Sequence, residues 1–153
     1  MEPLRVFIIE PADSMRESLA LFVRNLGYEA IACSSPAVFP CIDSSHCETG
    51  RQVCGDALIV GQHLPQQAGL DFIAQRLAGP CRGLVKNITL ICLPWSIGDQ
   101  QRAEKLGCRW LETPLDLGEL RSWLATIAEN LPADRKLVPL TELLVDREAR
   151  LPA

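Results

Sequence analysis

The sequence of 153 residues contains no apolar run near the roughly 18 residues that a membrane-spanning helix needs. It also lacks the basic start and long apolar core of a signal peptide, because residues 1–10, MEPLRVFIIE, carry acidic side chains and enter a predicted strand at once. These two absences predict no membrane association. We therefore expect a cytoplasmic location, where thiols stay reduced.

The chain also lacks an excess of positive charge, since it has 15 Lys and Arg residues against 19 Asp and Glu residues and a net charge of -4. The Lys and Arg residues are scattered and form no stripe, so the chain has no electrostatic footprint for nucleic acid. A chain of this length buries enough surface to fold as one domain without a disulfide or a metal. Protein or small-molecule partners are expected, and no nucleic acid.

Short apolar runs alternate with helical patterns along most of the chain. Strands are predicted at 4–9, 28–33, 57–60, 88–93 and 109–112, and helices at 15–26, 70–77, 96–106 and 116–131. Gly27 and Gly107 are typical helix C-terminal caps, and Ser96 and Asp116 are typical N-terminal caps. This order predicts an α/β fold with a doubly wound, five-stranded parallel sheet and right-handed crossovers.

An ionisable side chain is missing where such a sheet should carry its chemistry. In open α/β sheets, functional groups lie just past the carboxyl ends of the strands. The third predicted strand is followed there by Gly61 and then by QHLP. A glycine cannot ionise, accept a proton or take up phosphate, so Gly61 is the most informative residue in the chain.

Three ordered segments carry a resemblance to a known family. They are VFIIE followed by DSMRESLALFVRNLGY, then DALIVGQHLPQQAGLDFI, and then AEKLGCRWLETP. Over 4–131 the chain resembles the receiver domain of two-component response regulators, a CheY-like, flavodoxin-like fold. The resemblance implies two acidic residues that hold a divalent cation, a phosphorylated aspartate after the third strand, a Thr or Ser after the fourth, and a Lys before a Pro after the fifth.

The chain departs from that pattern at four of these positions. Glu10 matches the first acidic residue, but Pro11 stands at the second, and Gly61 replaces the phosphorylated aspartate. Cys92 replaces the Thr or Ser, and Thr113 stands before Pro114 in place of the lysine. Phosphoryl transfer needs a nucleophilic oxygen and a cation that neutralises the transferring group. The substitutions therefore predict that the phosphorylation chemistry has been lost.

The predicted function is that of a stand-alone pseudo-receiver that signals through protein-protein contacts. Its partners would be a histidine kinase, another regulator or a second copy of the chain. An enzyme on the same fold is the weaker hypothesis, because the strand ends offer only Glu10 and thiols and no glycine-rich phosphate loop follows the first strand. Asp56, Asp71 and His63 are the substitute phosphate acceptors to consider. The two aspartates are expected to cap backbone groups or face solvent, and His63 to be an ordinary loop residue.

The insert at 34–55 loses all periodicity and falls where the family has its second helix. It contains Cys41, Cys47 and Cys54, and Cys81 could approach from a neighbouring element. Four such thiolates suit a zinc or iron site that would hold the loop, which gives a metal- or redox-responsive sensor as the alternative function. No C-x-x-C is present, so a disulfide or free thiols remain open alternatives.

Two tryptophans mark a predicted interaction surface. The resemblance places Trp110 at the fifth strand and Trp123 on the last helix, on the face that receivers use for docking and dimerisation, and aromatics are enriched in binding hot spots. Packing at the core edge is the alternative reading. The tail, 132–153, is predicted to hold one short helix at 141–150, which would need a docking surface to be stable and is an alternative occupant of this same face.

Overall fold

The computed structural model describes residues 2–39, 52–79, 86–92 and 96–143. Its main sheet has five parallel strands in the order β2-β1-β4-β7-β8. Their bounds are β1 (Arg5–Ile9), β2 (Glu29–Cys33), β4 (Ala57–Gly61), β7 (Ile88–Cys92) and β8 (Arg109–Glu112). The predicted doubly wound, five-stranded parallel sheet is therefore confirmed.

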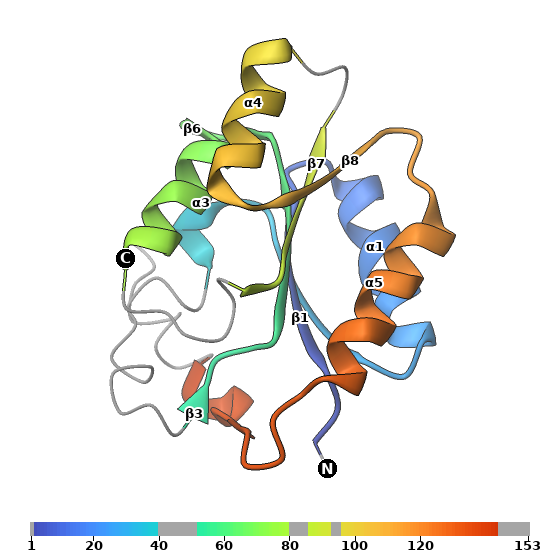
Figure 1. Cartoon of the computed structure of the whole chain (residues 1–153). Helices are drawn as coiled ribbons and strands as arrows, with labels where there is room; N and C mark the ends of the chain where they lie inside the picture. Colours follow the sequence, from blue (N-terminus) through green and yellow to red (C-terminus); the bar gives the residue numbers. More distant parts are fainter. Residues whose placement is uncertain (1, 40–51, 80–85, 93–95, 144–153) are drawn as a thin grey trace, which may run out of the picture.

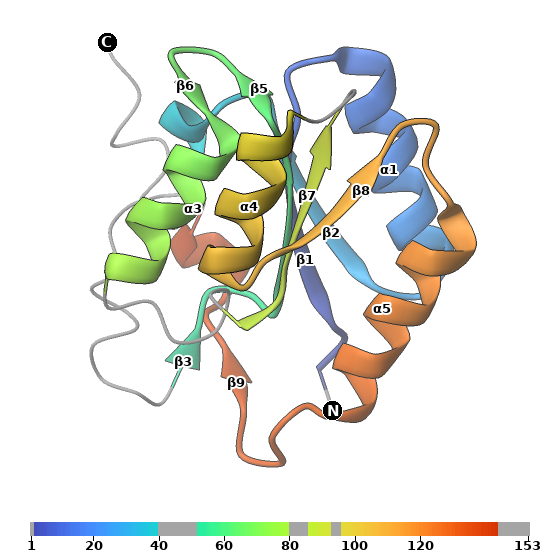
Figure 2. The same cartoon turned by 45° about the horizontal axis from the view of Figure 1, so that its top comes forward.

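Helices cover both faces of this sheet, as Figures 1 and 2 show. One face carries α1 (Asp13–Asn25) and α5 (Leu117–Glu129), and the other carries α3 (Gly69–Ala78) and α4 (Ile97–Leu106). Strands covered on both faces are nearly continuous apolar runs, and every residue of β1, β4 and β7 is buried, including the polar Arg5 and Thr89.

The side chains of β1 alternate between two apolar cores, as the period of two in a strand requires. Phe7 and Ile9 belong to the core under α3 and α4, which we call the α3/α4 core. Val6 and Ile8 belong to the core under α1 and α5, which we call the α1/α5 core. The apolar runs of the sequence thus fill two layers at once.

The predicted caps of α4 and the predicted N-terminal cap of α5 match the structure, whereas α1 begins two residues earlier and α5 ends two residues earlier than predicted. Ser96 Oγ accepts a hydrogen bond from Asp99 N at 3.0 Å, and Asp116 Oδ1 accepts one from Glu119 N at 3.1 Å. Gly107 ends α4 with a φ of 72°, in the left-handed region where a side chain is strained. Local sequence signals therefore set where α4 begins and ends and where α5 begins.

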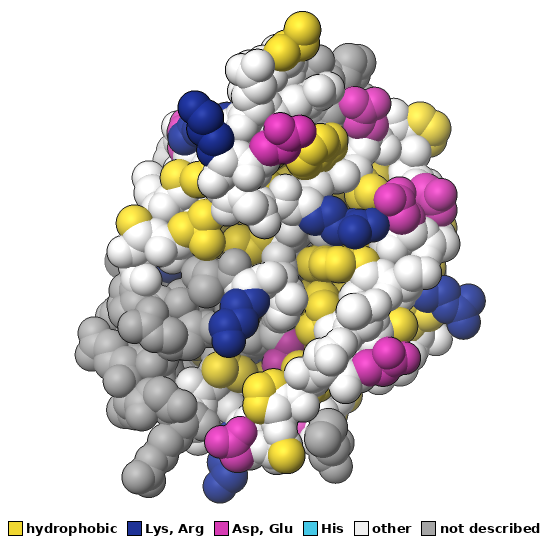
Figure 3. All heavy atoms as spheres, viewed as in Figure 1, with side chains coloured by type: hydrophobic (Ala, Val, Ile, Leu, Met, Phe, Trp, Pro, Cys, Tyr) yellow, Lys and Arg dark blue, Asp and Glu magenta, His cyan; other side chains and the backbone are white. Residues whose placement is uncertain are grey.

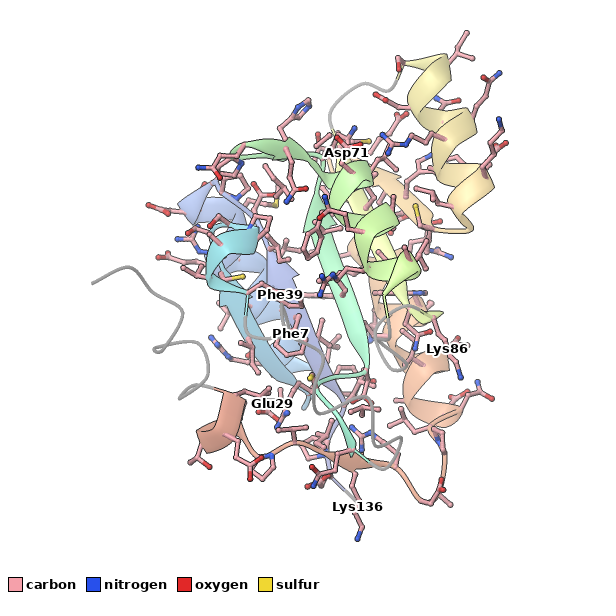
Figure 4. The ribbon with its side chains drawn as sticks, turned by 90° about the vertical axis from the view of Figure 1, so that its left-hand side faces the viewer. Phe7, Glu29, Phe39, Asp71, Lys86 and Lys136 are labelled. Atoms are coloured by element: carbon pink, nitrogen blue, oxygen red, sulfur yellow. The ribbon has the colours of Figure 1, made fainter. Side chains whose placement is uncertain are left out.

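An edge-to-face stack of three phenylalanines fills the α3/α4 core. The Phe7 and Phe39 ring centroids are 5.1 Å apart, and those of Phe39 and Phe72 are 5.6 Å apart. Phe39 follows the 3-10 helix η1 (Pro36–Val38), and Figure 4 shows it in the interior close to Phe7. The stack anchors the first part of the insert at 34–55, of which 40–51 lie outside the described residues.

The tail docks on the domain at the amino-terminal end of the sheet. Strand β9 (Lys136–Leu137) pairs in parallel with β3 (Gln52–Val53), as Figure 2 shows. Val138 and Leu143 are then buried in the α3/α4 core. Residues 132–143 therefore lie beside β3 at the amino-terminal end of the sheet. Most of the predicted helix at 141–150 lies outside the described residues, so its place on the tryptophan face stays a prediction.

Candidate functional site

A pocket of about 570 Å³ opens at the carboxyl ends of the strands. The five positions that the sequence singles out lie together in its wall. The lining residues are Glu10, Pro11, Ala12, Met15, Gly61, Gln62, His63, Ile91, Cys92 and Thr113. The strand order places them there, because the ends of β1, β4, β7 and β8 meet at one edge of the sheet.

The carboxylate of Glu10 lies directly over Gly61. A Cβ atom added at Gly61 would lie 2.5 Å from Glu10 Oε2, which is closer than real Cβ contacts allow. Glu10 Oε1 accepts a hydrogen bond from Ala12 N at 3.1 Å, which holds the side chain over the pocket. The glutamate thus fills the space that a side chain at position 61 would need.

Arg16 fastens the turn that follows β1. Its guanidinium donates hydrogen bonds to the carbonyl oxygens of Glu10 at 2.9 Å and Pro11 at 3.3 Å, and pairs with Asp13 at 2.5 Å. Because this cation is committed to carbonyls and to Asp13, it stabilises the turn. The second acidic position of the family pattern is Pro11, which has no side-chain oxygen for a metal ion.

Gln62 closes the loop between β4 and α3, a role that the sequence analysis missed. Its buried Oε1 accepts a hydrogen bond from Leu70 N at 3.0 Å, and its carbonyl oxygen accepts one from Gly69 N at 2.8 Å. A Cβ atom at Gly69 would overlap the carbonyl oxygen of Gly61 and lie 2.7 Å from Leu90 Cδ1. The loop therefore needs a glycine at 69. The contact of Gln62 with the backbone of Leu70, eight residues later, could not be recognised from the sequence because it follows no known motif.

Cys92 and Thr113 hold the ends of β7 and β8 together. Thr113 donates to the carbonyl oxygen of Cys92 through its backbone N at 3.0 Å and its Oγ1 at 3.5 Å, and the Thr113–Pro114 peptide is cis. Burial, together with the charges of Glu112 and Asp99, raises the pKa of the Cys92 thiol to about 12. The thiol is therefore protonated and unreactive at neutral pH.

The charge of the pocket lining differs from that of a phosphorylation site. Glu10 carries the one carboxylate in the wall, and no lysine or arginine of the described residues lines it. A transferring phosphoryl group needs cations to neutralise its developing charge. The lining offers none, and His63 is exposed at the rim in β5 (His63–Leu64).

The two substitute aspartates lie away from the pocket lining. Asp71 is half-exposed on α3 and pairs with Arg102 at 2.7 Å, so it faces solvent as predicted. Asp56 is only 4% exposed and pairs with Arg135, with Arg135 Nε 2.7 Å from Asp56 Oδ1. Asp56 therefore does not face solvent, because a tail arginine that is distant in sequence neutralises it, but its Oδ2 caps the backbone N of Arg5 at 2.8 Å, which agrees with the other expectation.

Three of the four predicted metal ligands lie outside the described residues. Cys41, Cys47 and Cys81 lie outside the described residues, whereas Cys54 is buried and disulfide-bonded. A disulfide sulfur is not a thiolate ligand, so the structure favours the disulfide alternative at Cys54. In the described ranges, no group of three His, Cys, Asp or Glu side chains could hold a metal ion.

The two tryptophans are half-buried and pack against different layers. Trp110 on β8 packs against the α3/α4 core, and Trp123 on α5 packs against the α1/α5 core. Figure 3 shows hydrophobic side chains in the region of β8 between α4 and α5, with charged side chains around them. Ile97 and Leu117, at the starts of α4 and α5, are 74% and 47% exposed. We call this surface of α4, β8 and α5 the β8 edge.

No protein-family model matches the sequence, and no curated protein does. Solved structures do match. A response regulator receiver protein from Pseudomonas putida is 19% identical with a TM-score of 0.65, and the match covers 82% of this chain and 98% of that one. A receiver domain of a modulated diguanylate cyclase from Desulfovibrio desulfuricans is 17% identical with a TM-score of 0.61, covering 84% and 95%.

A third match is the chemotaxis protein CheY4 of Vibrio cholerae, 18% identical with a TM-score of 0.57, covering 82% of this chain and 98% of that one. At these identities the likeness shows the fold. The chain therefore has the flavodoxin-like fold of receiver domains, and the fold implied by the resemblance in the sequence is confirmed.

Proposed function

We propose that this protein is a degenerate receiver, a response-regulator-like signalling module that acts through protein-protein contacts and is neither an enzyme nor phosphorylated. The observation that carries the proposal is the Glu10 carboxylate lying over Gly61, where a receiver would present its aspartate. A phosphoryl group entering this space would meet a carboxylate and no lining cation of the described chain. Like charge at such short range opposes transfer.

A signalling module that does not use phosphate must already have the conformation that its partner binds. The contacts of Thr113 with Cys92 join β7 to β8, and the ion pair of Arg109 with Glu119 at 3.2 Å joins β8 to α5. A ligand shifts an equilibrium only through different affinities for its states. Without a site for phosphate, these contacts persist, and a partner binds the conformation already present.

The β8 edge is the contact surface that we assign to this module. Trp110 and Trp123 supply half-buried aromatic area, and Ile97 and Leu117 expose apolar side chains that nothing described covers. Central aromatics surrounded by charged groups are typical of binding hot spots. The partner would be a histidine kinase, another regulator or a second copy of the chain.

The phosphorylation part of the proposal is tested most sharply by restoring the aspartate. We expect Gly61→Asp, incubated with acetyl phosphate and magnesium, to stay unphosphorylated, because Pro11 and Thr113 still leave the cation and the phosphoryl oxygens unsupported. Intact-mass measurement detects an adduct directly. A stable, acid-labile adduct on this variant would mean that only the aspartate is missing, and the pocket would then be one substitution away from a working receiver.

The contact part is tested on Trp123. We expect Trp123→Ala to weaken association at the β8 edge by about 1 kcal/mol or more while the domain stays folded. Sedimentation velocity reports self-association, and urea unfolding reports stability. Thr126→Ala, an exposed position on the same helix, is the matched control. If Trp123→Ala costs several kcal/mol of stability and leaves association unchanged, Trp123 is a core residue and the surface lies elsewhere.

A redox-responsive module is the second candidate, because Cys54 is disulfide-bonded at the amino-terminal end of the sheet. Its carbonyl oxygen accepts a hydrogen bond from Arg5 at 3.0 Å. The metal form of this alternative uses Cys41, Cys47, Cys54 and Cys81 with zinc or iron. Elemental analysis of protein purified under reducing conditions distinguishes the disulfide form of this alternative from the metal form. Near-stoichiometric metal that Cys47→Ser releases supports the metal site, and metal-free protein excludes it.

A further inference from the structure

The pocket at the carboxyl ends of the strands has the size of a small-molecule site. Its volume of about 570 Å³ lies within the range of ligand pockets, about 300–1,000 Å³. Its wall is mostly apolar and includes Met15, Ile91 and Pro11. Ligand sites commonly combine such a wall with a few placed polar groups. Glu10 is the group placed here.

Glu10 has unused capacity to accept hydrogen bonds. Its Oε1 is bonded to Ala12 N, whereas Oε2 has no hydrogen-bond donor among the described residues. The nearby Arg16 guanidinium donates to backbone carbonyls and to Asp13 instead. Glu10 is half-exposed, so Oε2 can exchange water for a charged N–H donor, and charge-assisted hydrogen bonds are the strong ones.

The surrounding charges favour a cation as well. Asp99 and Glu112 both contribute to the raised pKa of the Cys92 thiol, so their negative charge reaches the pocket wall. A ligand cation is therefore attracted by Glu10 and by the two carboxylates near Cys92.

The donor set suits an organic cation better than a metal ion. Magnesium binds through one or two carboxylates while keeping several of its waters, and calcium takes about six to eight oxygens. Glu10 is the one carboxylate of the described lining and the wall is otherwise mostly apolar, so a hydrated metal ion finds few polar contacts there. An ammonium group needs only a few acceptors and brings its own apolar body to Met15 and Ile91.

We propose that this pocket binds a small organic ammonium ion, with its N–H groups on Glu10 and its apolar body against Met15 and Ile91. Such a ligand would occupy the place where receivers take phosphate, and would give the module an input of its own. The inference stands apart from contact-based signalling, because it concerns only what the pocket holds.

The first test is a titration of the full-length, isotope-labelled protein followed by amide NMR shifts. Phenethylamine is expected to shift the amides of Gly61, Gln62 and Ile91 saturably. Phenethyl alcohol, the neutral analogue of the same shape, is expected to bind about tenfold more weakly or worse. Phenylacetate and magnesium are expected to leave these amides unshifted. Equal binding of the alcohol, or the same shifts with magnesium, would overturn the proposal.

The second test uses two matched carboxylate substitutions. Glu10→Gln keeps the size of the side chain and the acceptor for Ala12 N, and is expected to lower phenethylamine affinity about tenfold. Glu17→Gln removes an exposed carboxylate on α1 outside the pocket wall and is expected to change nothing. Unchanged affinity in Glu10→Gln contradicts the assignment.

A partner's lysine could supply the same chemistry, so Nα-acetyl-lysine methylamide, which presents the side-chain ammonium as a peptide does, is the last probe. Binding of this lysine mimic more tightly than phenethylamine would overturn the small-molecule assignment in favour of a partner's side chain. Phosphorylation of the wild-type protein is a separate measurement. The pocket proposal and the proposed function can therefore fail independently.

Discussion

The two ends of the central sheet use charge in opposite ways. At the amino-terminal end, Arg5 is 4% exposed, donates to the carbonyl oxygens of Cys54 and Val138, and lies 3.3 Å from Glu29 Oε2. Asp56 there is enclosed by Arg135 and by the backbone N of Arg5. At the carboxyl end, Glu10 has one hydrogen bond and no lining cation in the described chain.

The difference shows where this chain needs charged groups. Buried charges persist in proteins only when they are paired and hydrogen-bonded, and Asp56 meets that condition through Arg135 and the backbone N of Arg5. Arg5 and Glu29 form an ion pair, although Arg5 Nε and Glu29 Oε1 have no hydrogen-bond partner. Figure 4 shows Glu29 and Lys136 at this end and Asp71 toward the other. The end with the charge network fixes the tail, whereas the described lining of the pocket holds one carboxylate, that of Glu10, in a mostly apolar wall.

Removal of the tail is the strongest way to break this contrast. Truncation after Leu131 deletes Arg135, which pairs with buried Asp56, and uncovers the site of Val138 and Leu143. Each lost apolar side chain costs about 1.5–3 kcal/mol and an unpaired buried charge about 3–5 kcal/mol, so we expect loss of cooperative folding or strong self-association. Urea unfolding and light scattering measure both. Unchanged stability would show that the tail is not part of the domain.

A single substitution tests the charge network more gently. Asp56→Asn leaves the Arg135 guanidinium buried without its counter-charge and should cost about 3 kcal/mol or more of unfolding free energy. Asp71→Asn is the matched control, because the Asp71–Arg102 pair is 48% and 44% exposed and should cost less than about 1 kcal/mol. Equal effects of the two substitutions in urea unfolding would contradict the contrast between the ends.

Substitutions at two glycines of the pocket end are expected to change stability least, and they test specific contacts of the pocket. In Gly69→Ala the new Cβ atom meets the backbone oxygen of Gly61, which cannot move freely, so a cost of about 1–3 kcal/mol is expected. In Gly61→Ala it meets only the end of the Glu10 side chain, which can rotate away, so stability should change by less than about 1 kcal/mol. Thermal unfolding compares them, and the reverse order would mean that Glu10 is fixed.

Local patterns predict most of this fold. The apolar runs at 57–60 and 88–93 give β4 and β7, and Ser96 and Asp116 mark the starts of α4 and α5, because strand burial and helix caps depend on near neighbours. The five pocket positions also meet as the resemblance implies, because the strand order brings their ends together.

Contacts between distant residues are what sequence reasoning misses. Arg135 reaches Asp56 across 79 positions, and Gln62 caps α3 through a turn whose shape depends on Gly69. Neither contact leaves a local pattern, since charge pairing and close backbone approach are decided only when the layers pack. The position of the tail, with Val138 buried beside β3, is unpredicted for the same reason.

Phosphorylation of the wild-type protein is the most direct measurement of what the pocket does. The protein is incubated with acetyl phosphate and magnesium beside a receiver that carries the usual aspartate, and the intact mass of each is recorded. The pocket described above, with Glu10 over Gly61 and no lining cation in the described chain, predicts a phosphoryl adduct on the control alone. An acid-labile adduct on the wild-type chain would contradict the assignment of this protein as a phosphate-independent receiver.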